Sequence, residues 1–228
     1  MNCEMEMLMI EKINWQEAFR YMGLRGDISP EIEQMADECE SRLLKAASPK
    51  FHWVYAEIGE ISGDAVTLKG YKLVLRGRDI STHLKDCFGT ALLCATLGEG
   101  ADRLIRTVQA EDMAKALTLD ALASAAVEQV CDAAENEIRS RFPGKYTTWR
   151  FSPGYGDFPL DCQGDFLAAV NAMRTVGVCL SSGGLLTPTK SVTAVVGISD
   201  SPMPAKRRDC SSCKMKESCT FRKSGGHC

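Results

Sequence analysis

The chain has 228 residues, of which 45% are hydrophobic and 25% are charged, and this composition is typical of a globular protein. Its length is sufficient for one well-buried core and requires no second one. The formal net charge of −3 and the pI near 5.7 argue against a nucleic-acid-binding protein, which would carry a basic face.

The sequence also argues against a membrane-spanning protein and against a secreted one. No stretch approaches ~18 consecutive apolar residues, so we expect no membrane-spanning helix. The first ten residues contain Glu4 and Glu6 and no basic residue, unlike a signal peptide. Eleven cysteines, an odd number spread through periodic segments, do not suit a secreted disulfide scaffold. We therefore expect a cytoplasmic protein that binds neither membranes nor nucleic acids.

Two helices are predicted near the N-terminus by their capping residues. Asn14 and Glu17 form the start of a short helix that resembles a capping box, and Gly23 ends it. Ser29 caps the next helix, which has Pro30 at its first position.

Strands are predicted after these helices. Segments 51–61 and 66–75 are strand-like, with turns at residues 62–64 and 69–70. Asp79 or Ser81 is expected to cap a brief helix that follows them. The apolar run 90–97 is too short for a spanning helix and is interpreted as a buried strand.

A long helical segment follows. Residues 101–141 have helical periodicity, with a break expected near Ala110. On its exposed side we expect two acid–base pairs four residues apart, Glu135–Arg139 and Glu137–Arg141. Its inner stripe is expected to consist of Leu119, Leu122, Ala126, Val130 and Ala134.

The last third of the chain returns to strands. Residues 147–151 are predicted to form a strand that delivers Arg150 to a loop. A helix capped by Asp161 and closed by Gly177 comes next, and residues 191–198 form a final strand.

The predicted strands occur in pairs and clusters rather than alternating with helices. This order favours an α+β fold, with a twisted, largely antiparallel sheet flanked by helices, over a doubly wound sheet. We expect a single domain in residues 1–200, followed by a short Cys-rich C-terminal tail in residues 201–228.

One loop has the residues of a binding site for an amino acid. The planar guanidinium of Arg150 can hold a carboxylate through two hydrogen bonds. Gly154 lets the backbone approach a ligand closely, and Tyr155 offers a flat face and a hydroxyl group. Pro159 stiffens the exit of the segment.

The spacing R-x3-G-Y-x3-P of these residues resembles the signature of the activation domain of cobalamin-dependent methionine synthase, the module that binds S-adenosylmethionine. Residues 185–192 are similar to the M/L-x-P-x-x-S-V run of that family, and residues 95–98, before the long helix, resemble its stand-alone members. The resemblance extends over roughly residues 10–200.

The resemblance implies a twisted antiparallel sheet flanked by helices. It also implies a ligand site in which Arg150 holds the carboxylate of S-adenosylmethionine and Gly154 and Tyr155 shape the pocket. The family has an acidic residue for the ligand's amino group before its N-terminal tryptophan, where this chain has Asn14. An amide oxygen can accept a hydrogen bond from an ammonium group but adds no charge.

The function implied is that of an accessory protein in the reductive reactivation of a cobalamin-dependent methyltransferase, most simply methionine synthase. Such a module positions S-adenosylmethionine for methylation of cob(II)alamin rather than catalysing alone. The chain lacks the Asp-x-His-x-x-Gly motif of a cobalamin carrier. The resemblance therefore implies a partner chain that carries cobalamin, and a one-electron donor such as flavodoxin or ferredoxin.

The C-terminal tail contains four cysteines in a polar sequence, Cys210, Cys213, Cys219 and Cys228. Four thiolates can hold a zinc ion or an iron–sulfur cluster. A redox disulfide and a tail of reduced thiols are the other interpretations. A metal-bearing tail also supports an alternative function, in which the chain is an electron-transfer or assembly protein that does not bind S-adenosylmethionine.

Overall fold

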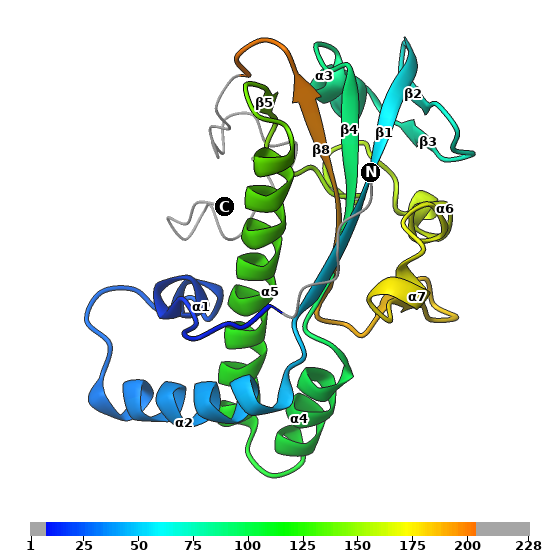
Figure 1. Cartoon of the computed structure of the whole chain (residues 1–228). Helices are drawn as coiled ribbons and strands as arrows, with labels where there is room; N and C mark the ends of the chain where they lie inside the picture. Colours follow the sequence, from blue (N-terminus) through cyan, green and yellow to red (C-terminus); the bar gives the residue numbers. More distant parts are fainter. Residues whose placement is uncertain (1–7, 204–228) are drawn as a thin grey trace.

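The computed structural model describes residues 8–203, so the predicted metal site at Cys210, Cys213, Cys219 and Cys228 lies outside the described residues. The described chain has an α+β fold with a six-stranded antiparallel sheet, which confirms the predicted fold class (Figure 1). The strand order is β3-β2-β1-β4-β8-β5, and a separate hairpin pairs β6 with β7. The strands are β1 (Lys50–Ser62), β2 (Ala65–Leu68), β3 (Val74–Arg76), β4 (Gly89–Thr96), β5 (Tyr146–Thr147), β6 (Cys179–Leu180), β7 (Leu186–Thr187) and β8 (Ser191–Ser199).

Helices cover both faces of the sheet. They are α1 (Trp15–Tyr21), α2 (Pro30–Ala46), α3 (Arg78–Leu84), α4 (Glu99–Gln109), α5 (Met113–Arg141), α6 (Gln163–Ala169) and α7 (Ala172–Thr175), with a 3-10 turn at Leu160–Cys162. The long helix α5 runs beside the central strands, and α1, α2 and α4 pack around its lower half as drawn in Figure 1. Helices α3, α6 and α7 contribute to the core on the other face of the sheet.

Alternating side chains on the central strands separate the two halves of the core. Trp53 and Leu93 are buried against α5, whereas their neighbours Val54 and Leu92 are buried on the face of α3 and α6. Both layers are needed because β4 is buried along its whole length. The apolar run that favoured a strand over a helix start is therefore a central strand, as predicted.

Helix α5 also matches its prediction, with one correction. The break expected near Ala110 separates α4 from α5, and Asp112 begins α5 by accepting hydrogen bonds from two backbone N–H groups. The predicted inner stripe is buried, and the pair between Arg139 Nη2 and Glu135 Oε2 is formed at 2.8 Å. Glu135 itself is not on the exposed side, because its side chain is only 8% exposed beneath a second cation, Arg150.

The prediction of one continuous helix between Asp161 and Gly177 is wrong, because this segment forms two short helices, α6 and α7. It is broken after α6, where Asn171 has a φ angle of 52°, a left-handed conformation that interrupts the helical hydrogen bonds. Asp161 does not cap α6 either, because it lies within the preceding 3-10 turn and Cys162 stands at the cap position of α6. Asparagine tolerates this conformation better than most residues, but its presence alone does not require a break.

Neither of the two residues predicted to cap α3 does so. Gly77 occupies the cap position, and the carboxylate of Asp157 accepts hydrogen bonds from the backbone N–H groups of Arg78 and Asp79, each at 3.0 Å. The cap therefore comes from a loop 78 positions further along the chain from Asp79. No helix in residues 8–203 is long and apolar enough to cross a membrane.

Candidate functional site

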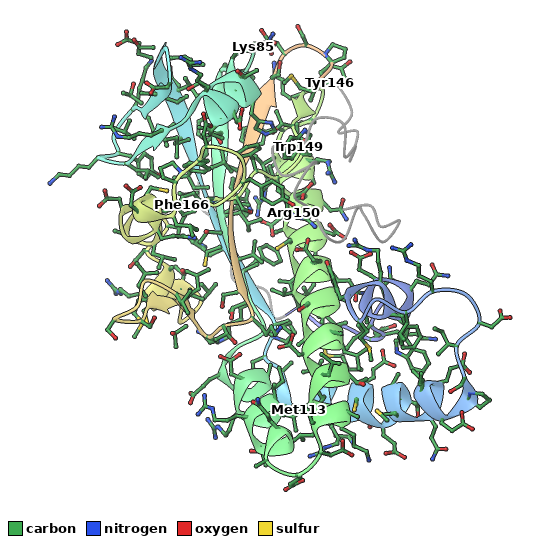
Figure 2. All side chains as sticks on the ribbon, turned by 180° about the vertical axis from the view of Figure 1, so that it is seen from behind. Lys85, Met113, Tyr146, Trp149, Arg150 and Phe166 are labelled. Atoms are coloured by element: carbon green, nitrogen blue, oxygen red, sulfur yellow. The ribbon has the colours of Figure 1, made fainter. Side chains whose placement is uncertain are left out.

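Arg150 reaches helix α5 because the segment after β5 follows the edge of the sheet. The predicted strand 147–151 is only partly formed: β5 ends at Thr147, and Phe151 then makes a single antiparallel bridge with Val195 of β8. Successive residues of an extended chain point to opposite faces. Phe151 is accordingly buried on the face of α3 and α6, whereas Arg150 extends to α5 (Figure 2).

Three carboxylates of α5 hold the Arg150 guanidinium. Nη2 donates to Glu128 Oε2 at 2.5 Å, and Nη1 donates to Asp132 Oδ1 at 2.6 Å and to Glu135 Oε1. The acceptors are four and three residues apart and so share one face of the helix. These contacts engage three of the five N–H donors of an arginine, so a second edge of the guanidinium can receive a ligand carboxylate.

The charges around Arg150 do not balance. Burial, which by itself lowers the pKa of Arg150, is outweighed by negative charge nearby, including Asp132 and Glu128, and the pKa is raised above its usual value. The guanidinium is therefore always charged. The three carboxylates are matched by Arg150 and by Arg139, which pairs with Glu135, so one negative charge remains in excess.

A hollow of about 350 Å³ lies next to this cluster, between the end of α1, the middle of α5 and the start of β8. Glu128 is common to both features, since it lines the hollow and bonds Arg150. Ser191, from the run at residues 185–192, lies in the wall of the hollow. The lining residues are Tyr21, Leu117, Asp120, Ala121, Ser124, Val127, Glu128, Thr189, Lys190 and Ser191.

Two side chains of the hollow were missed by sequence reasoning, Tyr21 and Lys190. Burial, followed by a hydrogen bond with Glu17 and the charge of Glu128, raises the pKa of Tyr21 to about 12, so its hydroxyl group stays protonated. Lys190 Nζ lies 2.8 Å from Asp120 Oδ1 and is 14% exposed. Tyr21 and Lys190 meet α5 only because distant segments of the chain pack together, so no short sequence pattern could have identified them.

Asn14, the other predicted contact at the N-terminal side, also lies against α5. Its backbone N–H donates to Gln129 Oε1 at 3.1 Å, next to Glu128. Its side-chain Oδ1 accepts from Glu17 N at 3.2 Å, which confirms the predicted N-cap of α1. The structure thus brings Asn14 and Arg150 to the same turns of the helix.

None of the five predicted binding residues is among the residues that line the hollow: Arg150 and Asn14 lie beside it against α5, and Gly154, Tyr155 and Pro159 lie farther along the chain. Gly154 has a φ of 95°, and its N–H donates to Phe158 O at 2.8 Å. Tyr155 is 54% exposed, with its ring 6.0 Å from that of Phe151, and Pro159 precedes the 3-10 turn. The structure places these three residues in a loop beyond the sheet edge, and their predicted contacts with a ligand stay predictions.

This loop is fixed against α3 by two close contacts. Asp157 caps α3, and the carboxylate of Asp79 accepts a hydrogen bond from Asp157 N at 3.2 Å in return. A Cβ at Gly156, whose φ is 56°, would lie 2.0 Å from Asp79 Oδ2, so the approach requires glycine. Residues in 8–203 provide no cluster of His, Cys, Asp and Glu side chains that could hold a metal ion.

The fold has a counterpart among solved structures. The reactivation domain of MetH, crystallised with AdoHcy bound, superposes with a TM-score of 0.64 over 98% of this chain and 86% of the other, at 15% sequence identity. At that identity the similarity shows a common fold, that of the domain that the R-x3-G-Y-x3-P spacing resembles. The sequence matches no protein-family model and no curated protein.

Proposed function

We propose that the chain is an S-adenosylmethionine-binding accessory protein for the reductive reactivation of a cobalamin-dependent methyltransferase, most simply methionine synthase. The observation that carries the proposal is the hollow on α5, whose wall includes Ser191 and Glu128; Arg150 does not line the hollow but bonds Glu128 at its edge. The segments that carry Arg150 and Ser191 were both selected from the sequence by their resemblance to the activation domain. A neighbour of the same fold holds AdoHcy, which is S-adenosylmethionine without its methyl group.

The hollow suits this ligand in size and in charge. Its volume of about 350 Å³ lies within the range of roughly 300–1,000 Å³ that is usual for small-molecule sites. Arg150 offers a guanidinium edge to the carboxylate, and the excess negative charge on α5 suits the sulfonium cation. The ring of Tyr21 provides a flat wall for an adenine ring or the sulfonium group.

The task of the protein in this proposal is positioning. An electron from a donor such as flavodoxin or ferredoxin would reduce cob(II)alamin on a partner chain, and S-adenosylmethionine would then give its methyl group to the cobalt and leave as S-adenosylhomocysteine. Arg150 and the walls of the hollow hold the ligand so that its methyl group faces the docked partner. Such placement converts an encounter of two molecules into a reaction within one complex. The buried thiols suit a reducing compartment such as the cytoplasm.

Calorimetric titration with S-adenosylmethionine tests the proposal. We expect saturable binding, and Arg150→Ala should weaken it by about 2–4 kcal/mol because the ligand carboxylate loses a partly desolvated partner. Arg139→Ala is the matched control, since Arg139 also bonds Glu135, whereas Arg150 in addition bonds Glu128, which lines the hollow. A wild-type chain that shows no binding at millimolar ligand would exclude the function.

The reactivation step is tested separately. We mix the protein with a cobalamin-bearing methyltransferase in its cob(II) state, S-adenosylmethionine and a low-potential electron donor. The visible spectrum should change to that of methylated cobalamin faster than without the chain. Equal rates with and without it would remove the reactivation role and leave a protein that only binds the ligand.

A further inference from the structure

We infer that Asp102, on α4, is a positioning residue for the hollow, because its carboxylate holds Thr189 and so fixes the wall that residues 189–191 form. The inference rests on the proposed function and adds a residue that does not touch the ligand. Asp102 is not among the residues that line the hollow, whereas Thr189, Lys190 and Ser191 are. No sequence pattern singled out Asp102.

Both oxygens of the Asp102 carboxylate are engaged by one residue. Oδ2 accepts from the backbone N–H of Thr189 at 2.6 Å, and Oδ1 accepts from the Thr189 hydroxyl group at 2.7 Å. Hydrogen bonds to an ionised acceptor are short and roughly twice as strong as neutral ones, and a pair of them also fixes orientation. The two residues are 87 positions apart in the chain, so the contact ties α4 to the segment just before β8.

The next residue is held from a different side. Lys190 Nζ donates to Ser124 Oγ at 2.9 Å and to the backbone oxygen of Asp120 at 3.2 Å, and it lies 2.8 Å from Asp120 Oδ1. These acceptors on α5 are as many as the donors of an ammonium group. Lys190 therefore anchors the wall to α5, and Asp102 anchors the preceding residue to α4.

Packing gives the wall little support on the side of Thr189. Residues 181–185, Thr187 and Thr189 are exposed, and Pro188 is the buried residue between them. A segment with few buried apolar contacts has a low local stability. The conformation of Thr189 is therefore set mainly by the two hydrogen bonds to Asp102. Without them the wall would be in its binding conformation for only part of the time, and the apparent affinity falls by that fraction.

Asp102 also lies in the first turn of α4, where a negative charge stabilises a helix. This second role has to be separated from the first. Glu99 offers the matched control because it is an acidic residue of the same turn, and its partner is Arg103 of the same helix, at 3.3 Å, rather than the wall of the hollow. Glu99→Ala removes the same charge from the helix and leaves Thr189 in place.

The first test is calorimetric titration with S-adenosylmethionine. We expect Asp102→Ala to bind about 5–30-fold more weakly than the wild type, because binding must then order the backbone of one further residue. Asp102→Asn should stay within about threefold of the wild type, since its amide can accept from the N–H of Thr189 and donate to the hydroxyl group. Glu99→Ala should change the affinity less than about twofold. Wild-type affinity in Asp102→Ala, or equal losses in the alanine and asparagine variants, would overturn the inference.

The second test needs no ligand. Amide hydrogen exchange of residues 189–192 is compared in the wild type, Asp102→Ala and Asp102→Asn. We expect exchange about 5–30-fold faster in the alanine variant at this segment, with α4 and α5 unchanged. Unchanged exchange at residues 189–192, or an equal rise throughout α4 and α5, would refute the positioning role. Failure of the wild-type chain to bind S-adenosylmethionine would refute the proposed function, whereas the exchange rates would still decide whether Asp102 fixes the wall.

Discussion

Replacing Arg150 by methionine should destabilise the fold even without a ligand, because three carboxylates lose their common cation. Their exposure sets the magnitude. Glu135 is 8% exposed but keeps Arg139 as a partner. We therefore assign the loss of its contact with Arg150 a destabilisation of about 2 kcal/mol, below the 3–5 kcal/mol expected when a buried charge is left without any partner. Glu128 is 34% exposed and contributes about 1 kcal/mol, and Asp132, at 62%, contributes close to zero, as exposed pairs do. The expected loss is about 3 kcal/mol, which corresponds to a fall in Tm of roughly 6–12 °C for a domain of this size.

Urea denaturation followed by circular dichroism measures this loss as a lower midpoint at unchanged slope. Arg139→Met is the control, since Arg139 is 49% exposed and should cost less than about 1 kcal/mol. Adding Glu135→Gln to Arg150→Met should recover about 1–2 kcal/mol, because the substitution removes the buried charge that has lost a partner. A midpoint of Arg150→Met within experimental error of the wild type, or no recovery in the double variant, would refute this account of the cluster.

Three further predictions concern other groups. Because burial, Glu17 and Glu128 raise the pKa of Tyr21 to about 12, its ultraviolet titration should have a midpoint near that pH, and Tyr21→Phe should remove this component. The folded state holds the phenol proton more tightly than the unfolded state, so the stabilisation from Tyr21 is present below about pH 10 and is lost as the pH rises towards 12. Burial raises the pKa of Cys94 to about 12, so iodoacetamide at pH 8 should alkylate it far more slowly in the native protein than in urea, and equal rates would show that the strand is open. Asp157→Ala removes the cap of α3 and should cost about 1–2 kcal/mol in the same urea assay, whereas a change below about 0.3 kcal/mol would mean that the loop contributes nothing to that helix.

The sequence was informative where the physical cause is local. Asn14 caps α1, the break expected near Ala110 separates α4 from α5, and the apolar run of β4 is a buried strand, because capping and periodicity act over a few residues. Local patterns failed at Asn171, where the chain adopts a left-handed turn that helical periodicity does not reveal. They also failed at α3, whose cap comes from a distant loop.

In the candidate site, too, local sequence patterns identified some residues and missed those that come together only by tertiary packing. Arg150 could be selected from its motif because a guanidinium in that spacing suggests a carboxylate ligand. Its three partners on α5 could not, because they lie 15 to 22 positions earlier and meet Arg150 only after the helix packs beside the sheet edge. Tyr21 and Lys190 reach the hollow through packing of α1 and the start of β8 on α5, which no spacing in the sequence encodes.

The edge segment that carries Arg150 also makes the two layers of the protein dependent on each other. Arg150 and Phe151 are consecutive, yet one is bound to α5 and the other is packed in the opposite layer with Phe158. A change in the volume of the layer behind the sheet, such as Phe158→Leu, would shift Phe151 and with it the guanidinium on the other side. Ligand affinity is therefore expected to respond to substitutions that never touch the ligand. Over evolution, the residues that pack Phe151 should vary together with the carboxylates of α5, because neither set can be adjusted without moving the other.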